Sequence, residues 1–378
     1  MRIIVLGGGL VGSAMARDLA ADNNFAVTIA DRNPAVREAL SSQYGLRTID
    51  VDATNKADLT KAVGEFDLVI GSVPGFMGYQ MLETVIEAGK DIVDISFFPE
   101  DPMQLDAKAR QHGVTAITDA GLQPGLGNLI LGRYIEEYDS VDEFVCYVGG
   151  LAQVRRWPFE YQSVFSPIDV LEEYTRPARM MRNGKLAVKP ALSEIELIDM
   201  PHVGTLEAFN SDGLRTLLDT VDVPNMVEKT LRYPGHAERM LMLRELGLFS
   251  RDKIVVDGQK VAPIDVTSKL MFDAWQPREN EFDLVSLRIE IKGQKAGKPC
   301  TTTFDMYDEH DLTNNVTSMA RTTGYTCTSA ARMVLAGLYN EKGIKPLEFI
   351  GANKAAFDSI VSDLAARDIM LDIKEVQG

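Results

Sequence analysis

The opening residues show the clearest pattern of apolar and polar positions in the chain. Residues 2–6 form a short, β-branched apolar run without polar alternation, which is typical of a buried parallel strand. A glycine-rich turn at 7–12 follows, and the small residues after it favour a closely packed helix. A second apolar run at 26–30 ends in Asp31. The pattern therefore predicts a strand, a turn, a helix and a second strand that ends in a carboxylate.

Apolar runs and amphipathic segments continue to alternate over the first third of the chain. Further strands are expected at 47–51, 66–70, 91–95 and 114–118, and helices at 34–40, 58–63, 79–88 and 104–111. Strand–helix repeats of this kind build right-handed, parallel, doubly wound sheets. The sequence thus predicts an α/β protein whose residues 1–125 form a Rossmann-type domain.

From residue 126 the pattern changes. Strands are expected at 143–148, 253–257, 283–291 and 301–307, with a hairpin loop at 292–297 and helices over 232–246 and 327–339. The strand at 283–291 alternates polar and apolar residues, as an antiparallel sheet with one solvated face does. We expect a second, α+β domain over residues 126–325 with a mostly antiparallel sheet, and a C-terminal segment from about 326 to 378 that packs back on the first domain.

The glycine turn carries the first candidate chemistry. Gly7 permits a tight turn, Gly9 lets the backbone approach a pyrophosphate, and Gly12 lets the helix pack against the strand. The backbone at Leu10 and Val11 then offers the free N–H groups of a helix N-terminus to the phosphates. A glycine-rich turn in a protein without a cofactor is the alternative, but the full order of elements favours a dinucleotide site.

Asp31 bears on which dinucleotide is bound. It follows Gly12 by 19 residues, where a carboxylate accepts a hydrogen bond from the ribose 2′-OH and repels a 2′-phosphate. This favours NAD over NADP. The neighbouring Arg32 offers an alternative, since its side chain can hold a 2′-phosphate or stack on the adenine.

Ligands of doubly wound sheets lie beyond the carboxyl ends of the strands, so the residues that follow each expected strand become candidates. We expect Asp52 and Ala53 near the adenine, although a solvated turn explains Asp52 equally well. Residues expected near the phosphates, the nicotinamide or the substrate are Ser72, Val73, Pro74, Ser96, Asp119 and Gln123.

Composition narrows the class of protein. A chain of 378 residues suggests two domains, and a net charge of −16 argues against nucleic acid or an anionic membrane as partner. The three cysteines are widely spaced and no Cys/His cluster suggests a metal site, so buried reduced thiols are expected. The first strand starts at once and no apolar run is long enough for a bilayer, which predicts a cytoplasmic protein.

The order of several motifs resembles the saccharopine dehydrogenase family, and within it the branch of lysine 6-dehydrogenases. The motifs are GGGLVG at 7–12, GLQPGLGN at 121–128, YVGG at 147–150 before Trp157 and Pro158, TLRYPGH at 230–236 and MARTTG at 319–324. The resemblance implies an NAD(P)-dependent dehydrogenase of an amino acid that forms a homodimer or a higher homo-oligomer. Saccharopine-forming members usually carry an acidic residue where this chain has Gln123 and an Asp-His pair where it has Gly127 and Asn128, which favours free lysine as the substrate.

Oxidation of the lysine ε-amine produces 2-aminoadipate 6-semialdehyde, which cyclises to Δ1-piperideine-6-carboxylate, together with ammonium and NADH. The site needs a clamp for the amino-acid carboxylate and a base near the ε-nitrogen. Arg232 is the candidate clamp and His236, one expected helical turn later, is the candidate base or orienting group. A salt bridge and a structural histidine are the alternatives. Asp119 and Gln123 are expected to hold the ε-nitrogen or the nicotinamide amide.

Further substrate contacts are expected in the second domain. Trp157, Tyr161 and Phe165 have a spacing that suits one helical face and can line the lysine methylenes, although core packing is the alternative. Glu207, Asn210 and Tyr233 are weaker candidates. The competing functions are a saccharopine or carboxynorspermidine-type dehydrogenase and a non-catalytic sensor that binds NAD.

Overall fold

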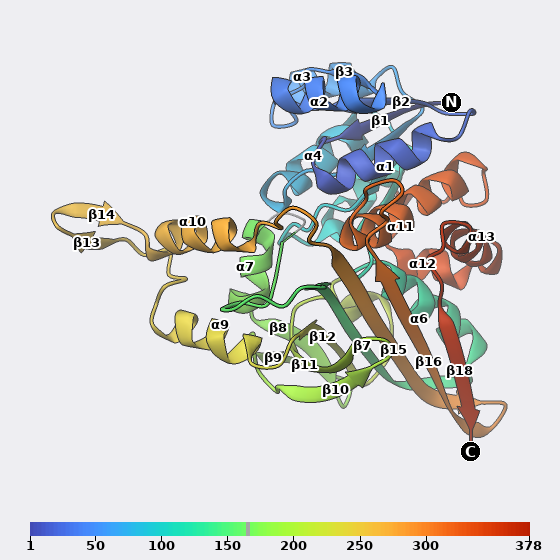
Figure 1. The fold of residues 1–378 in the computed structure, drawn as a ribbon. Helices are drawn as coiled ribbons and strands as arrows, with labels where there is room; N and C mark the ends of the chain where they lie inside the picture. The colour runs from blue at the N-terminus through green and yellow to red at the C-terminus, as the bar shows by residue number, and fades with distance from the viewer. Residues whose placement is uncertain (164–166) are drawn as a thin grey trace. The chain divides into compact units, whose positions relative to one another are not determined.

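The computed structural model describes residues 1–163 and 167–378 (Figure 1). Contacts divide these residues into two compact units. The first unit comprises residues 1–138 and 320–369, and the second comprises 139–319 and 370–378. Both units are therefore built from two separate stretches of the chain.

The first unit contains a parallel sheet with the order β17-β6-β5-β4-β1-β2-β3. Its strands are β1 (Arg2–Leu6), β2 (Ala26–Ala30), β3 (Arg47–Ile49), β4 (Leu68–Gly71), β5 (Ile92–Asp94), β6 (Thr115–Ile117) and β17 (Gly343–Ile344). This is a parallel, doubly wound sheet, as predicted from the strand–helix alternation, and it is extended by a strand from the C-terminal segment. The Rossmann-type fold is confirmed.

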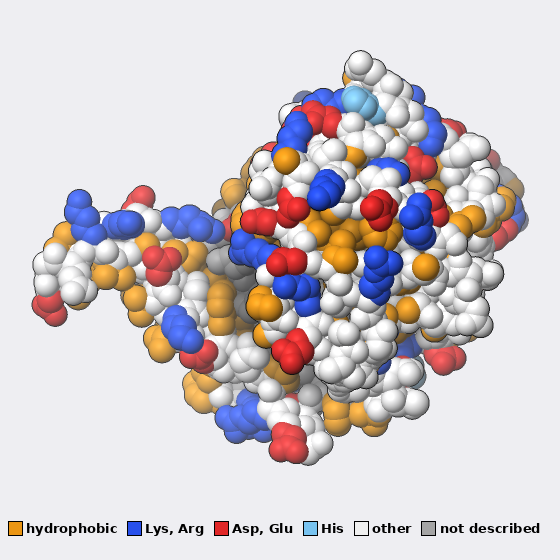
Figure 2. Space-filling model, turned by 90° about the horizontal axis from the view of Figure 1, so that it is seen from above, with side chains coloured by type: hydrophobic (Ala, Val, Ile, Leu, Met, Phe, Trp, Pro, Cys, Tyr) orange, Lys and Arg blue, Asp and Glu red, His pale blue; other side chains and the backbone are white. Residues whose placement is uncertain are grey.

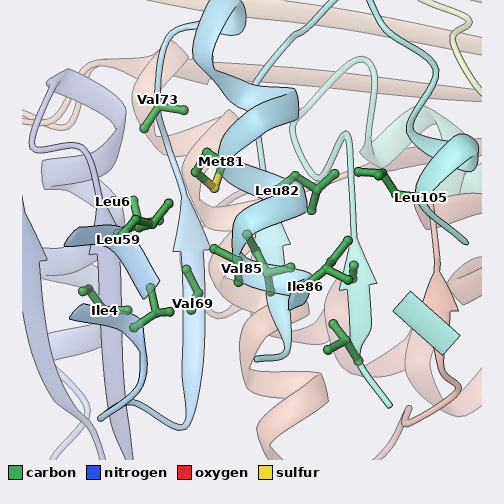
Figure 3. Packing of buried hydrophobic residues seen from close by; sticks show 14 of the residues in the cluster. Ile4, Leu6, Leu59, Val69, Val73, Met81, Leu82, Val85, Ile86 and Leu105 are labelled. Atoms are coloured by element: carbon green, nitrogen blue, oxygen red, sulfur yellow. The ribbon is translucent and has the colours of Figure 1, made fainter. Parts of the chain in front are cut away.

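Helices connect these strands and bury their apolar runs. They are α1 (Leu10–Ala20), α2 (Pro34–Tyr44), α3 (Lys56–Val63), α4 (Gly75–Glu87), the 3-10 turn η1 (Pro102–Leu105) and α5 (Asp106–Gln111). Figure 3 shows Ile4 and Val69 from neighbouring strands packed together with Leu82 and Val85 of α4. Because helices cover the sheet, its strands need apolar side chains on both faces, which explains the runs without alternation.

The later helices of the first unit are α6 (Leu126–Glu137), α11 (Ser318–Leu335), α12 (Leu347–Ala352) and α13 (Lys354–Ala365). Helices α6 and α12 pack backbone to backbone through two glycines. A Cβ atom on Gly132 would lie 2.0 Å from the Glu348 carbonyl oxygen, and one on Gly351 would lie 2.0 Å from that of Leu129. This contact ties α6 to the first unit, so the boundary lies at 138/139 and not at the expected residue 125.

The second unit contains a large mixed sheet with the main order β10-β11-β12-β7-β15-β16-β18. Its strands are β7 (Ser140–Ala152), β8 (Ala178–Arg182), β9 (Lys185–Lys189), β10 (Glu196–Met200), β11 (Gly204–Asn210), β12 (Met226–Arg232), β15 (Asp283–Lys295), β16 (Lys298–Glu309) and β18 (Asp372–Gln377). β12 and β7 pair in parallel, whereas the other strand pairs described in this second sheet are antiparallel. The mostly antiparallel sheet is thus confirmed.

Two details of this sheet differ from the sequence-based expectation. The hairpin between β15 and β16 turns at residues 296–297, because Lys295 already pairs with Lys298. The chain end also differs: β18 pairs with β16 at the sheet edge and belongs to the second unit, although the segment to residue 378 was expected on the first. A charged strand that is exposed along its whole length has no burial pattern to reveal its sheet.

The remaining elements of the second unit are α7 (Pro167–Thr175), α8 (Leu217–Thr220), α9 (His236–Glu245), α10 (Pro263–Trp275) and the hairpin of β13 (Ile254–Val256) and β14 (Gln259–Val261). The helix expected over 232–246 begins only at His236, because Arg232 ends β12. A core cluster joins Tyr174 of α7, Met240 of α9 and Trp275 of α10. Figure 1 shows the hairpin at the end of α10 that points away from the large sheet of the same unit.

Candidate functional site

The glycine turn has the geometry that a dinucleotide-binding loop needs. Gly7 has φ = 103°, a left-handed conformation that favours glycine. A Cβ atom on Gly12 would lie 2.1 Å from the Gly7 carbonyl oxygen, so α1 can pack this closely only through a glycine. The roles predicted for these two glycines are therefore seen in the backbone.

Gly9 lies beside open space. It is the N-cap of α1 without a side-chain capping bond, and a Cβ atom on it would meet no protein atom within 4 Å. Leu10 and Val11 begin the helix, and their N–H groups belong to its free N-terminus. Free amides beside unfilled space suit a phosphate group, so the residues present fit the pyrophosphate of a dinucleotide.

The Asp31 carboxylate lies at the end of β2 and is fixed by two backbone groups. The Gly8 N–H donates to its Oδ2 at 2.8 Å, and the Asn33 N–H donates to its Oδ1 at 2.8 Å. These bonds hold the carboxylate against the glycine turn, and each oxygen keeps a further lone pair. Arg32 is exposed. The structure thus places an anchored acceptor where a ribose hydroxyl was expected.

The other residues predicted to lie near the cofactor differ in their surroundings. The Asp52 carboxylate accepts from Thr54 N at 2.9 Å and from Thr54 Oγ1 at 2.6 Å, and these bonds lower the pKa of Asp52. It forms a local turn, as the alternative interpretation held. Ser72, in contrast, places its carbonyl oxygen against Gly7. Among the remaining candidates, Val73 and Ala53 pack on the core and Pro74 is the N-cap of α4.

A buried pair of carboxyl groups lies at the ends of the adjacent strands β5 and β6. Asp94 is fully buried and Asp119 is 3% exposed. Ser96 donates to Asp94 Oδ1 from its hydroxyl group at 2.7 Å and from its N–H at 3.0 Å. Asp94 Oδ2 has no hydrogen-bond partner among residues 1–163 and 167–378. The structure thus brings the predicted Ser96 and Asp119 together around a carboxyl group that sequence reasoning missed.

Burial is the main cause that raises the pKa of Asp94 to about 7, and the charge of Asp119 adds to it. A Cβ atom on Gly71 of β4 would lie 2.1 Å from Asp94 Oδ1, so the glycine makes room for this carboxyl group. Asp119 has φ = 53°, and Gln123 lies half-buried in the loop that leads from it to α6. The sequence did carry a signal for Asp94, because it is an acidic residue that ends an otherwise apolar strand.

Arg232 is not a free clamp for a carboxylate. It is 3% exposed, its Nη2 lies 2.6 Å from Glu173 Oε2, and its guanidinium group lies 4.5 Å from the centre of the Tyr161 ring. A buried arginine that already pairs with a carboxylate has little positive charge to offer to a substrate. The salt-bridge alternative describes Arg232 better than the predicted role.

His236 begins α9 and has both ring nitrogens engaged. Nδ1 lies 2.7 Å from the Phe159 carbonyl oxygen and therefore donates, so Nε2 accepts from Tyr174 OH at 2.9 Å. Burial, together with the charge of Arg232, lowers the pKa of His236 to about 3. The near-neutral pKa that suggested a base is absent. The prediction that Arg232 and His236 lie on one helical face is also wrong, because Arg232 lies on strand β12.

The aromatic candidates do not share a helical face either, since no helix covers residues 153–163. Tyr161 is buried between Arg232 and His236, whereas Trp157 is 78% exposed beneath Arg239. Phe165 lies outside the described residues. Tyr233 donates from its hydroxyl group to the Ala152 carbonyl oxygen at 2.8 Å. The core interpretation therefore fits Tyr161, although Trp157 and Tyr161 both line one pocket of the second unit, together with Phe159.

The two remaining polar candidates support the backbone. Glu207 accepts from the N–H groups of Gly235 and Ala237 and so caps the start of α9. Asn210 donates from Nδ2 to Ser193 Oγ at 3.1 Å and to Glu194 Oε2 at 3.0 Å, while its Oδ1 has no partner in the described part of the chain. Both side chains are buried. Their geometry assigns Glu207 a structural role and leaves Asn210 with one unused acceptor.

Sequence reasoning missed an arginine cluster in the second unit. Arg179 binds both oxygens of Asp212 at 2.9 Å, and Arg215 is 5% exposed. Burial lowers the pKa of Arg176, although the charges of Glu172 and Asp212 oppose this, and Arg215 and Arg179 lower it further. Three guanidinium groups thus lie within electrostatic reach of one another, and guanidinium groups bind carboxylates. The three arginines were detectable as charged residues flanking the 210–212 turn and the end of α7.

The described residues hold neither a metal-ligand group nor a membrane-spanning helix. Residues 1–163 and 167–378 contain no group of three His, Cys, Asp or Glu side chains arranged to hold a metal ion. Nor does any helix of that part have the length and apolarity to cross a membrane. The three cysteines are free and buried, as predicted.

The chain is similar to known proteins over most of its length. It is 24% identical to the mitochondrial alpha-aminoadipic semialdehyde synthase of Mus musculus over 79% of this chain and 32% of that enzyme. It is 21% identical to carboxyaminopropylagmatine dehydrogenase of Synechocystis sp. over 92% of both chains. The chain spans about a third of the length of the mammalian enzymes it matches.

A solved structure and two family models agree with this likeness. The apo saccharopine dehydrogenase (L-Glu forming) of Saccharomyces cerevisiae has the same fold, with a TM-score of 0.81 at 21% identity and 99% coverage of both chains. The family model of the saccharopine dehydrogenase NADP binding domain matches residues 3–117, and that of the saccharopine dehydrogenase C-terminal domain matches residues 121–369. The chain therefore belongs to the saccharopine dehydrogenase family.

Proposed function

We propose that the protein is a lysine 6-dehydrogenase, which oxidises the ε-amine of lysine with a nicotinamide cofactor and releases ammonium. The observation that carries this proposal is the buried carboxyl pair of Asp94 and Asp119. It lies at the carboxyl end of the sheet whose glycine turn fits a dinucleotide. Two carboxyl groups in a buried place attract a cation, and the ε-ammonium group of lysine is a cation at neutral pH.

Bound NAD accepts a hydride from the carbon that bears the amine. The chain itself must bind the ammonium group, remove a proton from it and exclude water until oxidation is complete. Asp119 is the candidate acceptor of that proton. Asp94 is held by Ser96 and lies close enough to feel the charge of Asp119, so the two carboxyl groups together can attract the ammonium group. Neutral lysine nitrogen then has the lone pair that amine oxidation requires.

Within the second unit, the arginine cluster is our candidate for binding a substrate carboxylate. Arg176, Arg179 and Arg215 influence one another's charge, and a guanidinium group binds carboxylates bidentately. In this proposal, the cluster replaces Arg232 as the site for the amino-acid carboxylate.

For the cofactor we propose NAD. The anchored Asp31 carboxylate would accept from a ribose 2′-OH and repel a 2′-phosphate. The name of the matching family model points to NADP, and so does the name of the yeast relative, an NADP(+)-dependent, L-glutamate-forming saccharopine dehydrogenase. Both cofactors therefore belong in the test.

Saccharopine dehydrogenase activity is the second candidate. Saccharopine carries more carboxylates than lysine does, and a cluster of three arginines suits such a substrate. The names of several relatives point the same way. The alternative predicts that a secondary amine with a glutamate moiety is turned over faster than free lysine.

Spectrophotometric assays with NAD and with NADP on lysine, ornithine, saccharopine and carboxynorspermidine test the proposal. We expect kcat/KM to be highest for lysine with NAD, with one ammonium released per reduced cofactor. A higher kcat/KM for saccharopine would replace lysine as the substrate. Cofactor binding without reduction on any of the four amines would indicate a non-catalytic sensor.

A further inference from the structure

The loop that follows Asp119 is closed by contacts within its own backbone. Gly121 forms a bridge to Gly125, which has φ = 143°. A Cβ atom on Gly125 would lie 1.8 Å from the Gly121 carbonyl oxygen, so the loop can close in this way only through a glycine. Asp119 itself has φ = 53°, a left-handed conformation that a residue other than glycine keeps only where its surroundings support it. The placement of Asp119 therefore depends on how this loop is held.

The side chain of Asn128 fastens the end of this loop to the C-terminal segment. It is 1% exposed, and its Oδ1 accepts from the Gly125 N–H at 3.2 Å. Its Nδ2 donates to Oε2 of Glu348, 220 residues away, at 3.1 Å. Glu348 lies on α12, which packs against α6, the helix of Asn128 (Figure 1). All of these residues belong to the first unit, as do Asp94 and Asp119.

A helix cap accounts for only one of the two bonds. Capping the start of α6 requires an acceptor for the Gly125 N–H, and a carboxylate or a hydroxyl group supplies one. The bond to Glu348 requires a donor on the same side chain, which an amide has and a carboxylate lacks. Glu348 is 2% exposed, whereas Figure 2 shows acidic side chains at the surface next to Lys and Arg. Because a buried carboxylate needs donors, the Asn128 amide does more than cap α6: it joins the loop to α12.

We propose that Asn128 is a positioning residue, whose amide joins the loop of residues 119–125 to α12 so that Asp119 stays beside Asp94. This inference rests on the proposed function, in which the two carboxyl groups bind and deprotonate the substrate amine. Asn128 acts through Asp119 and not on the substrate, because its amide oxygen and nitrogen are both engaged within the protein. Its loss should therefore change the rate of amine oxidation and the charge of the carboxyl pair, but not the affinity for the cofactor.

Asn128→Leu removes both bonds without adding a charge. Misplacing a catalytic group by about 1 Å can cost about 100-fold in rate, so we expect kcat for lysine to fall about 10- to 100-fold. The affinity for NADH, measured by fluorescence titration, should stay unchanged. Asn128→Ser has a shorter side chain that does not reach Glu348, and it carries the same expectation if the leucine variant does not fold. A normal kcat in a folded variant with either substitution would overturn the proposal.

Substitutions in the C-terminal segment separate positioning from stability. Glu348→Gln keeps an acceptor for the Asn128 amide and should retain kcat, whereas Glu348→Leu should lower it. If both residues act through one bond, the double variant of Asn128→Leu and Glu348→Leu loses no more than Asn128→Leu alone. Asn353→Ala is the control, because Asn353 caps α13 by accepting from the Ala356 N–H at 3.2 Å. It should lower the thermal unfolding midpoint but not kcat. Multiplied losses in the double variant, or an equal fall of kcat in Asn353→Ala, would contradict the positioning role.

The titration of Asp94 reports on the position of Asp119 without any substrate. Burial and the charge of Asp119 raise the pKa of Asp94 to about 7. Cys327 of α11 also lies within electrostatic reach of Asp94, but burial raises the pKa of its thiol, which therefore stays uncharged. In Asn128→Leu we expect the pKa of Asp94 to fall, because a displaced Asp119 adds less negative charge beside it. Asn353→Ala should leave the pKa of Asp94 at about 7.

Carbon-13 NMR of the full-length chain labelled at its aspartate carboxyl groups measures this titration, and Asp94→Asn assigns the signal. If the unmodified chain oxidises none of the tested amines, the proposed function fails, and the titration alone decides whether Asn128 positions the carboxyl pair. An Asp94 titration that is the same in Asn128→Leu and in the unmodified chain would overturn the inference.

Discussion

Asp119→Asn is expected to lower kcat for lysine oxidation by roughly 100- to 10,000-fold, the range typical for the loss of a general base. The amide keeps the size of the side chain, but it neither attracts the ammonium group nor accepts a proton from it. Asp119 lies at the end of β6 with 3% exposure, beside the buried Asp94. Steady-state assays with saturating NAD measure the effect, and fluorescence titration with NADH should show that cofactor binding is retained.

The pH dependence of kcat/KM distinguishes a role of the carboxyl pair in catalysis from a purely structural role. Because the pKa of Asp94 is raised to about 7, the pair carries less negative charge below pH 7 and more above it. We expect kcat/KM to rise as the pH rises through about 7, and Asp94→Asn to remove this step. Asp101→Asn is the control, since Asp101 is exposed and an asparagine can still accept from Met103 N. A step that persists in Asp94→Asn, or full activity of Asp119→Asn, would contradict the proposed role of the pair.

Gly9→Val is expected to weaken NAD binding at least about 100-fold, equivalent to about 2.7 kcal/mol, with little change in the unfolding midpoint. Gly9 has φ = −66° and ψ = −171°, which valine adopts readily, and the space around its Cβ position holds no protein atom within 4 Å. The added methyl groups would instead fill the space that the pyrophosphate needs. Calorimetric titration with NAD and a thermal melt measure the two quantities.

Substitutions at two other glycines serve as controls for Gly9→Val. Gly12→Ala should lower both binding and thermal stability, because its Cβ atom would clash with the Gly7 carbonyl oxygen at 2.1 Å. Gly64→Ala should change neither, since Gly64 has φ = −55° and only ordinary contacts. If Gly9→Val bound NAD normally, the glycine turn would not be the phosphate site.

The first unit was predictable because its signals are local. Strands buried on both faces require uninterrupted apolar runs, so β1 and β2 were found with their observed bounds. The backbone needs of Gly7 and Gly12 follow from the turn itself. The α6 boundary was missed because Gly132 packs against Glu348 and Gly351 against Leu129, contacts across more than 200 residues that no local pattern contains.

The second unit was harder because its polar residues are buried with partners. β12 is buried along its whole length although it contains Glu228, Lys229 and Arg232. Ser211 donates to Glu228 Oε2, Lys229 pairs with Glu196, and Arg232 pairs with Glu173. A pattern that equates polar with exposed cannot identify such a strand, and the partners lie 17 to 59 residues away.

Burial and partner side chains also explain why Arg232 and His236 do not have the catalytic roles that the sequence predicted for them. The sequence suggested His236 for its usual pKa and Arg232 for its charge. Burial and neighbouring side chains remove both properties. For Asp94 the environment has the opposite effect. Burial and the nearby charge of Asp119 raise the pKa of Asp94 to about 7, so this carboxyl group titrates near neutral pH. The surroundings of each side chain, and not its residue type, therefore separate the rejected candidates, His236 and Arg232, from the carboxyl pair.

Isotope transfer from lysine tests the central claim most directly. Lysine that carries two deuterium atoms at C6 should reduce NAD to a product one mass unit heavier than NADH, as measured by mass spectrometry. Lysine deuterated at C2 is the matched control and should give unlabelled NADH. Label from C2 in place of C6, or reduction without label from either carbon, would contradict oxidation at the ε-amine.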